Sequence, residues 1–217
     1  MSVENPIESK SSTSTSWSSV EIDSSVRVLD KSILSTWSSG KGVGVIRASR
    51  PIPDNGMGYY FEITILNCPD DPCYIDMGIT SQKLQFQEIS ARAKNNNSGF
   101  RHTFNSFGYS STGDMYWPNG EKRNKMQEYK GGDTIGCYFD IKRELCCFFL
   151  NGNLQNKILQ VKNTNESFIP TLVFYNKGIV VDSLFVGKNW ILDAQGTISN
   201  LVFYFLDLIQ YLNCIIN

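Results

Sequence analysis

The chain has 217 residues, of which 41% are hydrophobic, 12% aromatic and 19% charged, and its formal net charge is -1. A chain of this length can bury a full hydrophobic core in one domain and still carry tails. Its near-neutral charge argues against a general binder of the nucleic-acid backbone, which needs a basic face, so no nucleic-acid partner is expected.

The first 19 residues are rich in Ser and Thr and poor in apolar side chains. Such a segment cannot compensate for the entropy lost on ordering, so we expect a disordered tail, with Trp17 as the exception that could dock onto the domain. The segment has acidic residues and no apolar core, unlike a secretory signal. We therefore expect a cytoplasmic or nuclear protein with reduced thiols, unless a leader has been removed.

Short apolar runs recur from Val20 onward between clusters of Gly, Pro, Asn and Asp. Alternation of apolar and polar residues predicts strands at Tyr59–Leu66 and Ile75–Thr80. Further strands are predicted at Lys41–Ala48, Phe107–Ser111, Thr134–Asp140, Leu145–Leu150, Phe168–Tyr175 and Ile179–Phe185. Gln82–Ala93 could form a helical turn or two, and Thr112–Arg123 reads as a loop. This spacing indicates an all-β fold, an antiparallel β-sandwich.

Residues 194–217 have a different character. From Ile198 to Ile216 the polar residues recur at a roughly helical period, which predicts an amphipathic helix packed on the domain or on a partner. A poorly ordered extension is the alternative. A membrane span is disfavoured, because Asp207 near its centre would cost about 2.5–3.5 kcal/mol.

The chain contains six cysteines without a CxxC pair, so no metal site is expected. Cys137, Cys146 and Cys147 lie in strand-like runs, where a free thiol behaves as a small hydrophobe. Cys68 and Cys73 flank a Pro-Asp-Asp-Pro turn and could approach each other. Two reduced loop cysteines are the favoured interpretation.

Catalytic motifs are missing from the sequence. The single histidine, His102, has no nucleophile elbow to serve, and no GxGxxG, P-loop or HExxH pattern occurs. Glu62 and Asp76 are single strand carboxylates that we expect to face solvent, rather than the pair that glycoside hydrolysis needs. We therefore expect no catalytic residues, no cofactor and no enzymatic activity.

Several motifs in order carry a resemblance to a known family. Gly131–Gly152 combines a Gly-Asp entry, an apolar strand with an internal glycine, and Phe-Phe-Leu followed by Asn-Gly, a strong hairpin signal. Val45–Asn67 places Arg-Ala-x-x-Pro-Ile-Pro before Tyr-Tyr-Phe-Glu, and Phe168–Leu172 adds Phe-Ile-Pro-Thr-Leu. Together these resemble the SPRY domain of Ran-binding protein M and its relatives.

The resemblance covers about Ile22 to Asp193 and implies a concanavalin-like jelly roll, with residues 20–193 as the SPRY domain. Gly108–Asp114 departs from the family's Gly-Tyr-His-Gly-Asp-Asp-Gly. Because such departures fall in loops, the fold can be carried over but the partner of a relative cannot.

The family implies a non-catalytic protein–protein interaction module, a scaffold or an adaptor, that binds a peptide or protein surface through its loops. Ubiquitin ligase subunits are among the implied partners. Aromatic and Arg side chains dominate binding hot spots. The candidate binding residues are therefore Arg50, Pro51, Ile52, Tyr109, Tyr116, Trp117 and Tyr175.

Other interpretations stay open. Tyr109 and Trp117 could simply cover the sheet, and Phe174 is expected in the core. A carbohydrate-binding or hydrolysing sandwich is a second functional class. A secreted SPRY effector is a third, against which the lack of a leader counts.

Overall fold

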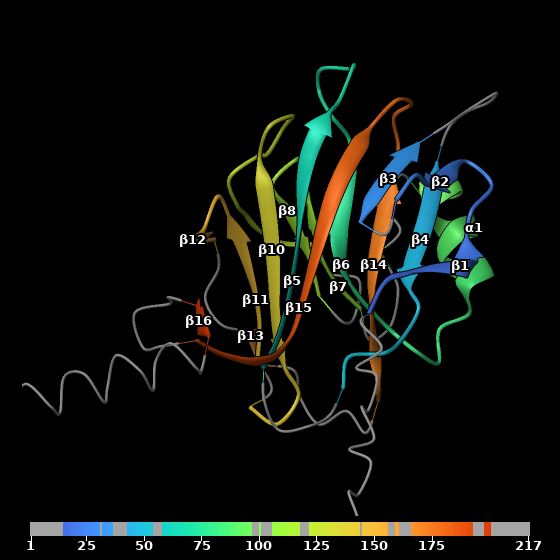
Figure 1. The fold of residues 1–217 in the computed structure, drawn as a ribbon. Coiled ribbons are helices and arrows are strands. Elements are labelled where there is room, and N and C mark those ends of the chain that lie inside the picture. Colours follow the sequence, from blue (N-terminus) through green and yellow to red (C-terminus); the bar gives the residue numbers. More distant parts are fainter. Residues whose placement is uncertain are drawn as a thin grey trace, which may run out of the picture.

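A computed structural model describes residues 15–30, 32–36, 43–53, 58–96, 100, 106–117, 122–143, 145–155, 159–160, 166–192 and 198–200. Two antiparallel sheets stack face to face in these parts of the chain (Figure 1). The predicted all-β sandwich is therefore confirmed.

Seven strands form the first sheet, here called sheet A. Their spatial order is β1 (Trp17–Ile22), β4 (Gly44–Ala48), β14 (Phe168–Phe174), β6 (Ile75–Ser81), β7 (Ser106–Ser110), β8 (Asp114–Tyr116) and β9 (Lys122–Lys125).

Nine strands form the second sheet, sheet B. The order is β12 (Asn153–Leu154), β11 (Leu145–Leu150), β10 (Thr134–Asp140), β5 (Gly58–Asn67), β15 (Val180–Leu192), β3 (Ile33–Thr36) and β2 (Val26–Val28), with β13 (Leu159–Gln160) beside β11 and β16 (Ile198–Asn200) beside β15.

The main core lies between the two sheets and follows from the period-two pattern of the strands. Phe61, Ile63 and Ile65 of β5 point inward, each at most 1% exposed, while Glu62 and Thr64 point outward. The predicted alternation of Ile75, Met77 and Ile79 in β6 is likewise confirmed, as is the burial of Phe174. The Asn151–Gly152 pair forms the expected β-turn, with φ values of 50° and 77°.

Helix α1 (Phe86–Asn96) covers the outer face of sheet A, where Figure 1 shows it beside β1 and β4. Ile89 and Ala93 of the helix pack with Val45 and Val173 of the sheet, and all four are fully buried. Gln82–Ala93 was expected to be helical, and the helix starts four residues later and extends to Asn96.

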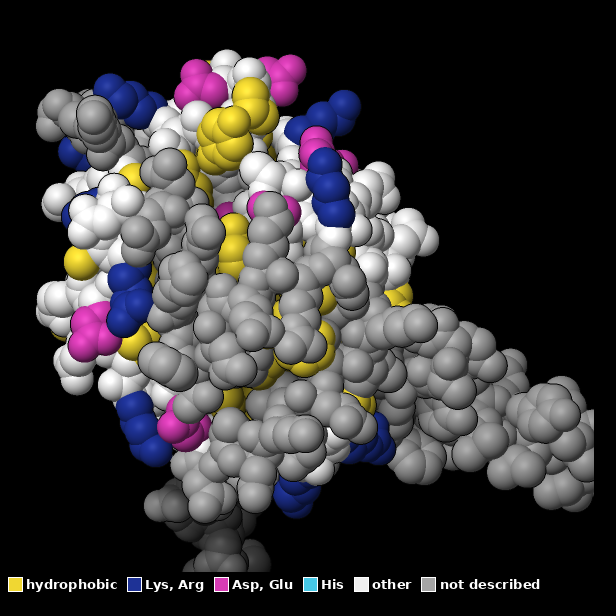
Figure 2. Space-filling model, turned by 180° about the vertical axis from the view of Figure 1, so that it is seen from behind, with side chains coloured by type: hydrophobic (Ala, Val, Ile, Leu, Met, Phe, Trp, Pro, Cys, Tyr) yellow, Lys and Arg dark blue, Asp and Glu magenta, His cyan; other side chains and the backbone are white. Residues whose placement is uncertain are grey.

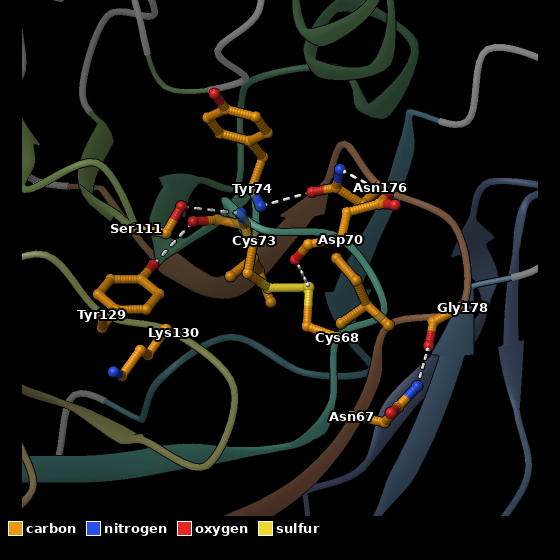
Figure 3. The surroundings of a disulfide bond; sticks show 12 residues. Asn67, Cys68, Asp70, Cys73, Tyr74, Ser111, Tyr129, Lys130, Asn176 and Gly178 are labelled. Carbon is orange, nitrogen blue, oxygen red and sulfur yellow. Dashed lines mark hydrogen bonds between the residues drawn. A yellow bond between two sulfur atoms is a disulfide. The ribbon is translucent and has the colours of Figure 1, made fainter.

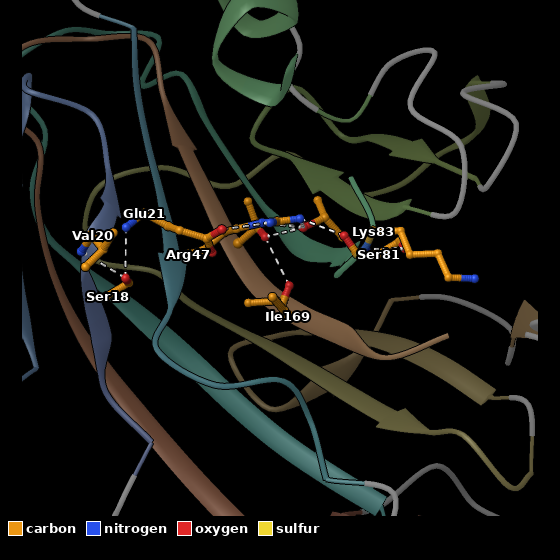
Figure 4. A network of polar contacts seen from close by, with 9 residues as sticks. Ser18, Val20, Glu21, Arg47, Ser81, Lys83 and Ile169 are labelled. Atoms are coloured by element: carbon orange, nitrogen blue, oxygen red, sulfur yellow. Dashed lines mark hydrogen bonds and ion pairs between the residues drawn. The ribbon is translucent and has the colours of Figure 1, made fainter. Parts of the chain in front are cut away.

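A polar network lies on the same outer face (Figure 4). Arg47 is 1% exposed. Its Nη2 donates to Thr80 Oγ1 at 2.9 Å and to the Ser81 carbonyl at 2.7 Å, and its Nη1 lies 3.3 Å from Glu21 Oε1. Thr171 Oγ1 lies 2.8 Å from Thr80 Oγ1 and extends the network to β14. A buried guanidinium is tolerated here because it is both paired and hydrogen-bonded.

The outer face of sheet B is covered in a different way. Tyr60 and Tyr138 are cross-strand neighbours on β5 and β10, and each ring lies over a glycine of the opposite strand. A Cβ at Gly136 would lie 2.3 Å from the Tyr60 hydroxyl, and one at Gly58 would lie 2.1 Å from that of Tyr138. These glycines leave the space that the tyrosine rings fill.

Three boundaries differ from the sequence-based expectation. Strand β1 includes Trp17, which is 5% exposed, so the disordered tail predicted up to residue 19 extends too far. Thr112–Arg123 contains β8 and the start of β9 rather than only a loop. Ile198–Asn200 pairs with β15 as a strand instead of starting a helix, and the rest of the predicted C-terminal helix lies outside the described residues.

Asp76 also differs from the prediction. It is 2% exposed and accepts a hydrogen bond from the Tyr175 hydroxyl at 2.9 Å, because α1 and its neighbours enclose the outer face of sheet A. No helix among the described residues is long and apolar enough to cross a membrane.

Candidate functional site

Four of the described connections at one end of the sandwich, the upper end in Figure 1, form the candidate site. They are the β5–β6 loop (68–74), the β7–β8 loop (111–113), the β9–β10 loop (126–133) and the β14–β15 turn (175–179). We call this end the tip and the opposite end the base. Because β5 runs from base to tip over ten residues, the two ends are about 30 Å apart.

The β14–β15 turn holds the β5–β6 loop in place through Asn176 (Figure 3). Its side-chain carbonyl accepts the backbone N–H of Tyr74, and its amide nitrogen donates to Asp70 Oδ2 at 2.9 Å. The backbone N–H of Tyr175 donates to the Tyr74 carbonyl at 3.0 Å. The Asn67 side chain donates to the Gly178 carbonyl at 2.9 Å. The two connections therefore form one unit.

A disulfide joins Cys68 and Cys73 inside this loop, with Cα atoms 5.9 Å apart. The prediction of two reduced loop cysteines is therefore wrong. The turn between them brings the two side chains together at the spacing that disulfides require. Cys73 is 4% exposed and packs against the core, with Cys68 partly buried beside it.

Tyr129 anchors the β9–β10 loop. Its hydroxyl donates to the carbonyls of Ile75 at 2.8 Å and Tyr109 at 2.9 Å, and its backbone N–H donates to the Ser111 carbonyl at 3.1 Å. Burial raises the pKa of the Tyr129 phenol well above its usual value, so it remains a protonated donor at neutral pH. Tyr109 packs edge-on against Tyr129, with ring centroids 4.9 Å apart.

A pocket of about 320 Å³ lies between the β5–β6, β7–β8 and β9–β10 loops. Its lining residues are Asp71, Pro72, Cys73, Tyr74, Ser111, Thr112, Glu128, Tyr129 and Lys130. Tyr74 is 41% exposed. Figure 2, seen from behind, shows hydrophobic side chains at the tip with acidic side chains on both sides. Such a mixture of apolar surface and convergent polar groups is typical of a binding site.

The titratable and nucleophilic groups of the pocket are few. Ser111 Oγ accepts the backbone N–H of Ile75 at 3.2 Å, and no histidine is among the described residues that line the pocket. His102 lies outside the described residues. Within the described part of the chain, no group of three His, Cys, Asp or Glu residues is arranged to hold a metal ion.

The structure does not bring the predicted binding residues together. Arg50 and Pro51 are exposed at the base. Ile52 is 4% exposed, and its backbone N–H donates to the Phe168 carbonyl. Tyr175 belongs to the tip. Arg50 and Tyr175 follow opposite ends of paired strands, β4 and β14, and are therefore about 20 Å apart along the sheet.

The remaining candidates are buried or partly buried. Tyr109 is fully buried in the main core, and Tyr116 is 6% exposed in the cluster beneath α1. Trp117 is partly buried and packs against the main core. Buried side chains offer no surface to a partner, so Ile52, Tyr109 and Tyr116 are corrected from binding to structural residues.

Sequence reasoning missed Tyr74, Asp71 and Lys130, which line the pocket. The sequence does contain a signal for this site: a Pro-Asp-Asp-Pro turn lies between two cysteines, and Tyr74 follows the second one. A turn closed by two cysteines holds the residues next to it in fixed positions. Nothing local marks Lys130, because only the topology brings the β9–β10 loop next to the β5–β6 loop.

The family model for the SPRY domain matches residues 58–186, more than half of the chain. The chain belongs to the SPRY family. Within it, the chain is similar to Ran-binding protein 9 of Danio rerio, 25% identical over 155 residues, covering 71% of this chain and 24% of that protein. The Ran-binding proteins 9/10 homolog of Drosophila melanogaster is 26% identical over 152 residues, covering 67% and 15%. The SPRY chain thus spans about a quarter or less of these relatives.

Solved SPRY structures share the fold. The SPRY domain of human HERC1 superposes with a TM-score of 0.61 at 19% identity, covering 80% of this chain and 99% of that one. The TRIM65 PSpry domain gives a TM-score of 0.54 at 12% identity, covering 79% and 92%. SPRY domains are a family of protein-interaction modules, which are generally non-catalytic.

Proposed function

We propose that this chain is the recognition module of an adaptor or scaffold, and that it binds a peptide or protein segment of its partner at the tip pocket. The preformed pocket beside an exposed tyrosine is the observation that carries the proposal. A loop surface held by Asn176, Tyr129 and a disulfide loses little entropy on binding, which favours affinity.

The pocket suits a peptide segment in size and lining. Tyr74 and Pro72 offer apolar area, and Asp71 and Lys130 offer one charge of each sign at the exposed rim. Glu128 is paired with Lys125 at 3.1 Å, and both are exposed. Apolar side chains can therefore enter the pocket while polar groups around it set the orientation.

A photo-crosslinking residue at position 74 tests the site. The chain is incubated with lysate of its own cells, irradiated, and the joined peptides are identified by mass spectrometry. We expect a discrete partner peptide joined to position 74. The matched control carries the same crosslinker at Val20, which is 85% exposed on β1 of sheet A. Equal capture at both positions would show nonspecific contact and contradict the proposal.

A substitution test separates the tip from the base. Tyr74→Ala should weaken capture of the crosslinked partner by about thirtyfold, because losing an aromatic hot spot costs about 2 kcal/mol or more. Arg50→Ala, at an exposed residue of the base, should leave capture intact. Loss of capture in Arg50→Ala, with retention in Tyr74→Ala and unchanged thermal unfolding, would move the binding surface to the base.

We propose further that the captured partner is presented to a larger assembly, with ubiquitin ligase subunits as the candidates that the family resemblance suggests. Co-purification of ligase subunits with the full-length protein, and ubiquitination of the crosslinked partner, would support this role. A partner that is captured but recruited to no ligase would restrict the function to scaffolding.

A secreted effector is the second candidate, and the Cys68–Cys73 disulfide is the observation that favours it. Structural disulfides persist in oxidising compartments, whereas cytosolic thiols are kept reduced. Fractionation of the native cells decides between the two: protein in the medium supports the effector, and protein in the cytoplasm or nucleus supports the adaptor.

A further inference from the structure

We infer that the Cys68–Cys73 disulfide is a redox switch that controls partner binding at the tip pocket. This inference rests on the proposed function, because the switch acts on the pocket assigned to the partner. It assigns a role to the two cysteines beyond the binding activity of the family. It is carried by the position of the disulfide, by the contacts of its loop, and by the contrast with the buried cysteines.

The disulfide belongs to the wall of the pocket. Cys73 lines it, and the chain that the disulfide closes contributes Asp71 and Pro72 to the same wall. Figure 3 shows Asp70 and Tyr74 on the same side of the bond, both close to it. A change in the bond therefore changes the part of the loop that a partner would contact.

Few other contacts fix this segment. Asp70 is held by the Asn176 amide at 2.9 Å, while Pro69, Asp71 and Pro72 are exposed. Beyond Cys73 the chain is held by the Tyr74 contacts and then by β6. Without the disulfide, the exposed turn would keep one side-chain tether, and its conformational freedom would increase. Binding would then have to order the turn again, which lowers affinity.

The other described cysteines are protected from the same chemistry. Cys137, Cys146 and Cys147 are free thiols that are fully buried. Burial raises the pKa of Cys147 to about 12 and that of Cys146 well above its usual value. The thiolate is the reactive form, so Cys146 and Cys147 stay inert at neutral pH, and Cys137, at 0% exposed, is out of reach of a dissolved thiol. Among the described cysteines, only the pair at the tip borders the pocket, and its partly buried member, Cys68, is the sulfur that a small thiol can reach.

The switching reaction needs a small thiol such as glutathione as the co-reactant. Its thiolate attacks one sulfur of the Cys68–Cys73 bond, that bond breaks, and a mixed disulfide forms. A second small thiol displaces the protein sulfur. The products are two protein thiols and one molecule of oxidised glutathione, so two electrons and two protons pass to the protein. The reverse exchange restores the bond.

Hydrogen exchange of the protein alone tests the first step. The chain is compared before and after treatment with reduced glutathione at neutral pH, with alkylation and peptide mapping to confirm which cysteines were reduced. We expect about tenfold faster exchange at the backbone amides of Tyr74 and Tyr175, with no change in β10. Unchanged exchange at the tip after confirmed reduction, or glutathione that fails to reduce the bond, would overturn the switch.

Binding tests the second step, with the peptide identified by crosslinking at position 74 as the probe. Reduction should weaken its affinity about tenfold, and Cys68→Ser with Cys73→Ser should show the weak affinity with or without thiol. Cys147→Ala is the matched control and should respond as the wild type does. Equal affinity in both redox states would refute the switch but leave the proposed function standing. If instead Tyr74→Ala binds the probe as well as wild type, the proposed function fails.

Discussion

The two sheets bury similar inner faces but cover their outer faces by different means. On sheet A, helix α1 packs over Val45 and Val173, and a buried Arg47 joins β4 to β6. On sheet B, Tyr60 and Tyr138 lie against glycines of the neighbouring strands. The first cover comes from an inserted helix and the second from the strands themselves.

The difference indicates which substitutions should destabilise each outer face. The sheet A cover depends on charged groups that must keep their partners, because an unpaired buried charge is costly. The sheet B cover depends on space, because a single added methyl group would collide with a ring. Substitutions that disturb charge should therefore act on sheet A, and substitutions that add volume should act on sheet B.

Replacing Arg47 should have the largest effect. Arg47→Met removes the hydrogen bonds to Thr80 and Ser81 and leaves Glu21 without its partner. We expect a loss of about 2–3 kcal/mol in the free energy of unfolding, measured by urea denaturation. Glu21→Gln leaves the buried guanidinium without its counter-charge, but it keeps an acceptor there and this side chain is 36% exposed, so it should cost less, about 1 kcal/mol. A larger effect of Glu21→Gln would contradict this assignment.

Adding a methyl group at Gly136 should come next. Its Cβ would lie 2.3 Å from the Tyr60 hydroxyl, and that hydroxyl is held by a 2.6 Å hydrogen bond to Glu62. We expect Gly136→Ala to destabilise the protein by about 2 kcal/mol. The control is Gly131→Ala, where the nearest atom would be 3.9 Å away. The penalty at Gly136 should largely disappear in a Tyr60→Ala background, and a persistent penalty would exclude the collision as its cause.

Asp23 gives the sheet A cover a pH dependence. Its carboxylate accepts a hydrogen bond from Ser90 at 2.7 Å and pairs with Lys94 at 2.9 Å, both on α1. Burial alone would raise the pKa of Asp23, but the contacts with Lys94 and Ser90 outweigh it and lower the pKa below its usual value. Asp23 therefore stabilises the fold above its unfolded pKa of about 3.9, and this contribution is lost as the pH falls through the lower folded pKa.

The corresponding substitution is Asp23→Asn. It should cost about 1 kcal/mol at pH 7, since Lys94 is half-exposed and its pairing is partly screened. Denaturation curves from pH 7 down to acid should show the wild type converging on the variant below about pH 4. A difference that stays constant over this range would mean that Asp23 does not titrate with folding.

The smallest effect is expected at Leu184, on the outer face of sheet B. This side chain is 54% exposed and lies opposite Glu62 across the β5–β15 pair. Leu184→Ser should change the free energy of unfolding by less than about 0.5 kcal/mol. A loss of 2 kcal/mol in urea denaturation would show that Leu184 belongs to the sheet B cover, as Val186 of the same strand does.

Most of the frame follows from period-two patterns in the sequence. Phe61, Ile63 and Ile65 alternate cleanly, and Asn151–Gly152 marks its turn, because these signals are local. The short strands β8 and β9 were missed, since their few residues carry too little pattern. The prediction for Asp76 is wrong because the side chain that bonds to it, Tyr175, is 99 residues away in the sequence.

The candidate site was far less predictable than the frame. Arg50 and Tyr175 are both predicted to bind a partner because Arg and Tyr in loops are common at binding hot spots. The sequence of a loop, however, does not tell which end of the sandwich the loop occupies. Tyr109 has the right chemistry for a hot spot and is fully buried. Only strand order, a property of the whole chain, brings Asp71 and Lys130 to the same pocket.

Trp17 has a consequence for how the protein is made. Its indole Nε1 donates to Ser183 Oγ at 2.6 Å, and its ring lies 4.9 Å from that of Phe185. The first strand of sheet A thus closes against the last long strand of sheet B, 166 residues later. During synthesis on the ribosome, the sandwich cannot be completed until β15 has emerged. The segment that contains Trp17 therefore stays unpacked while nearly the whole domain is synthesised. During this time chaperones would have access to it.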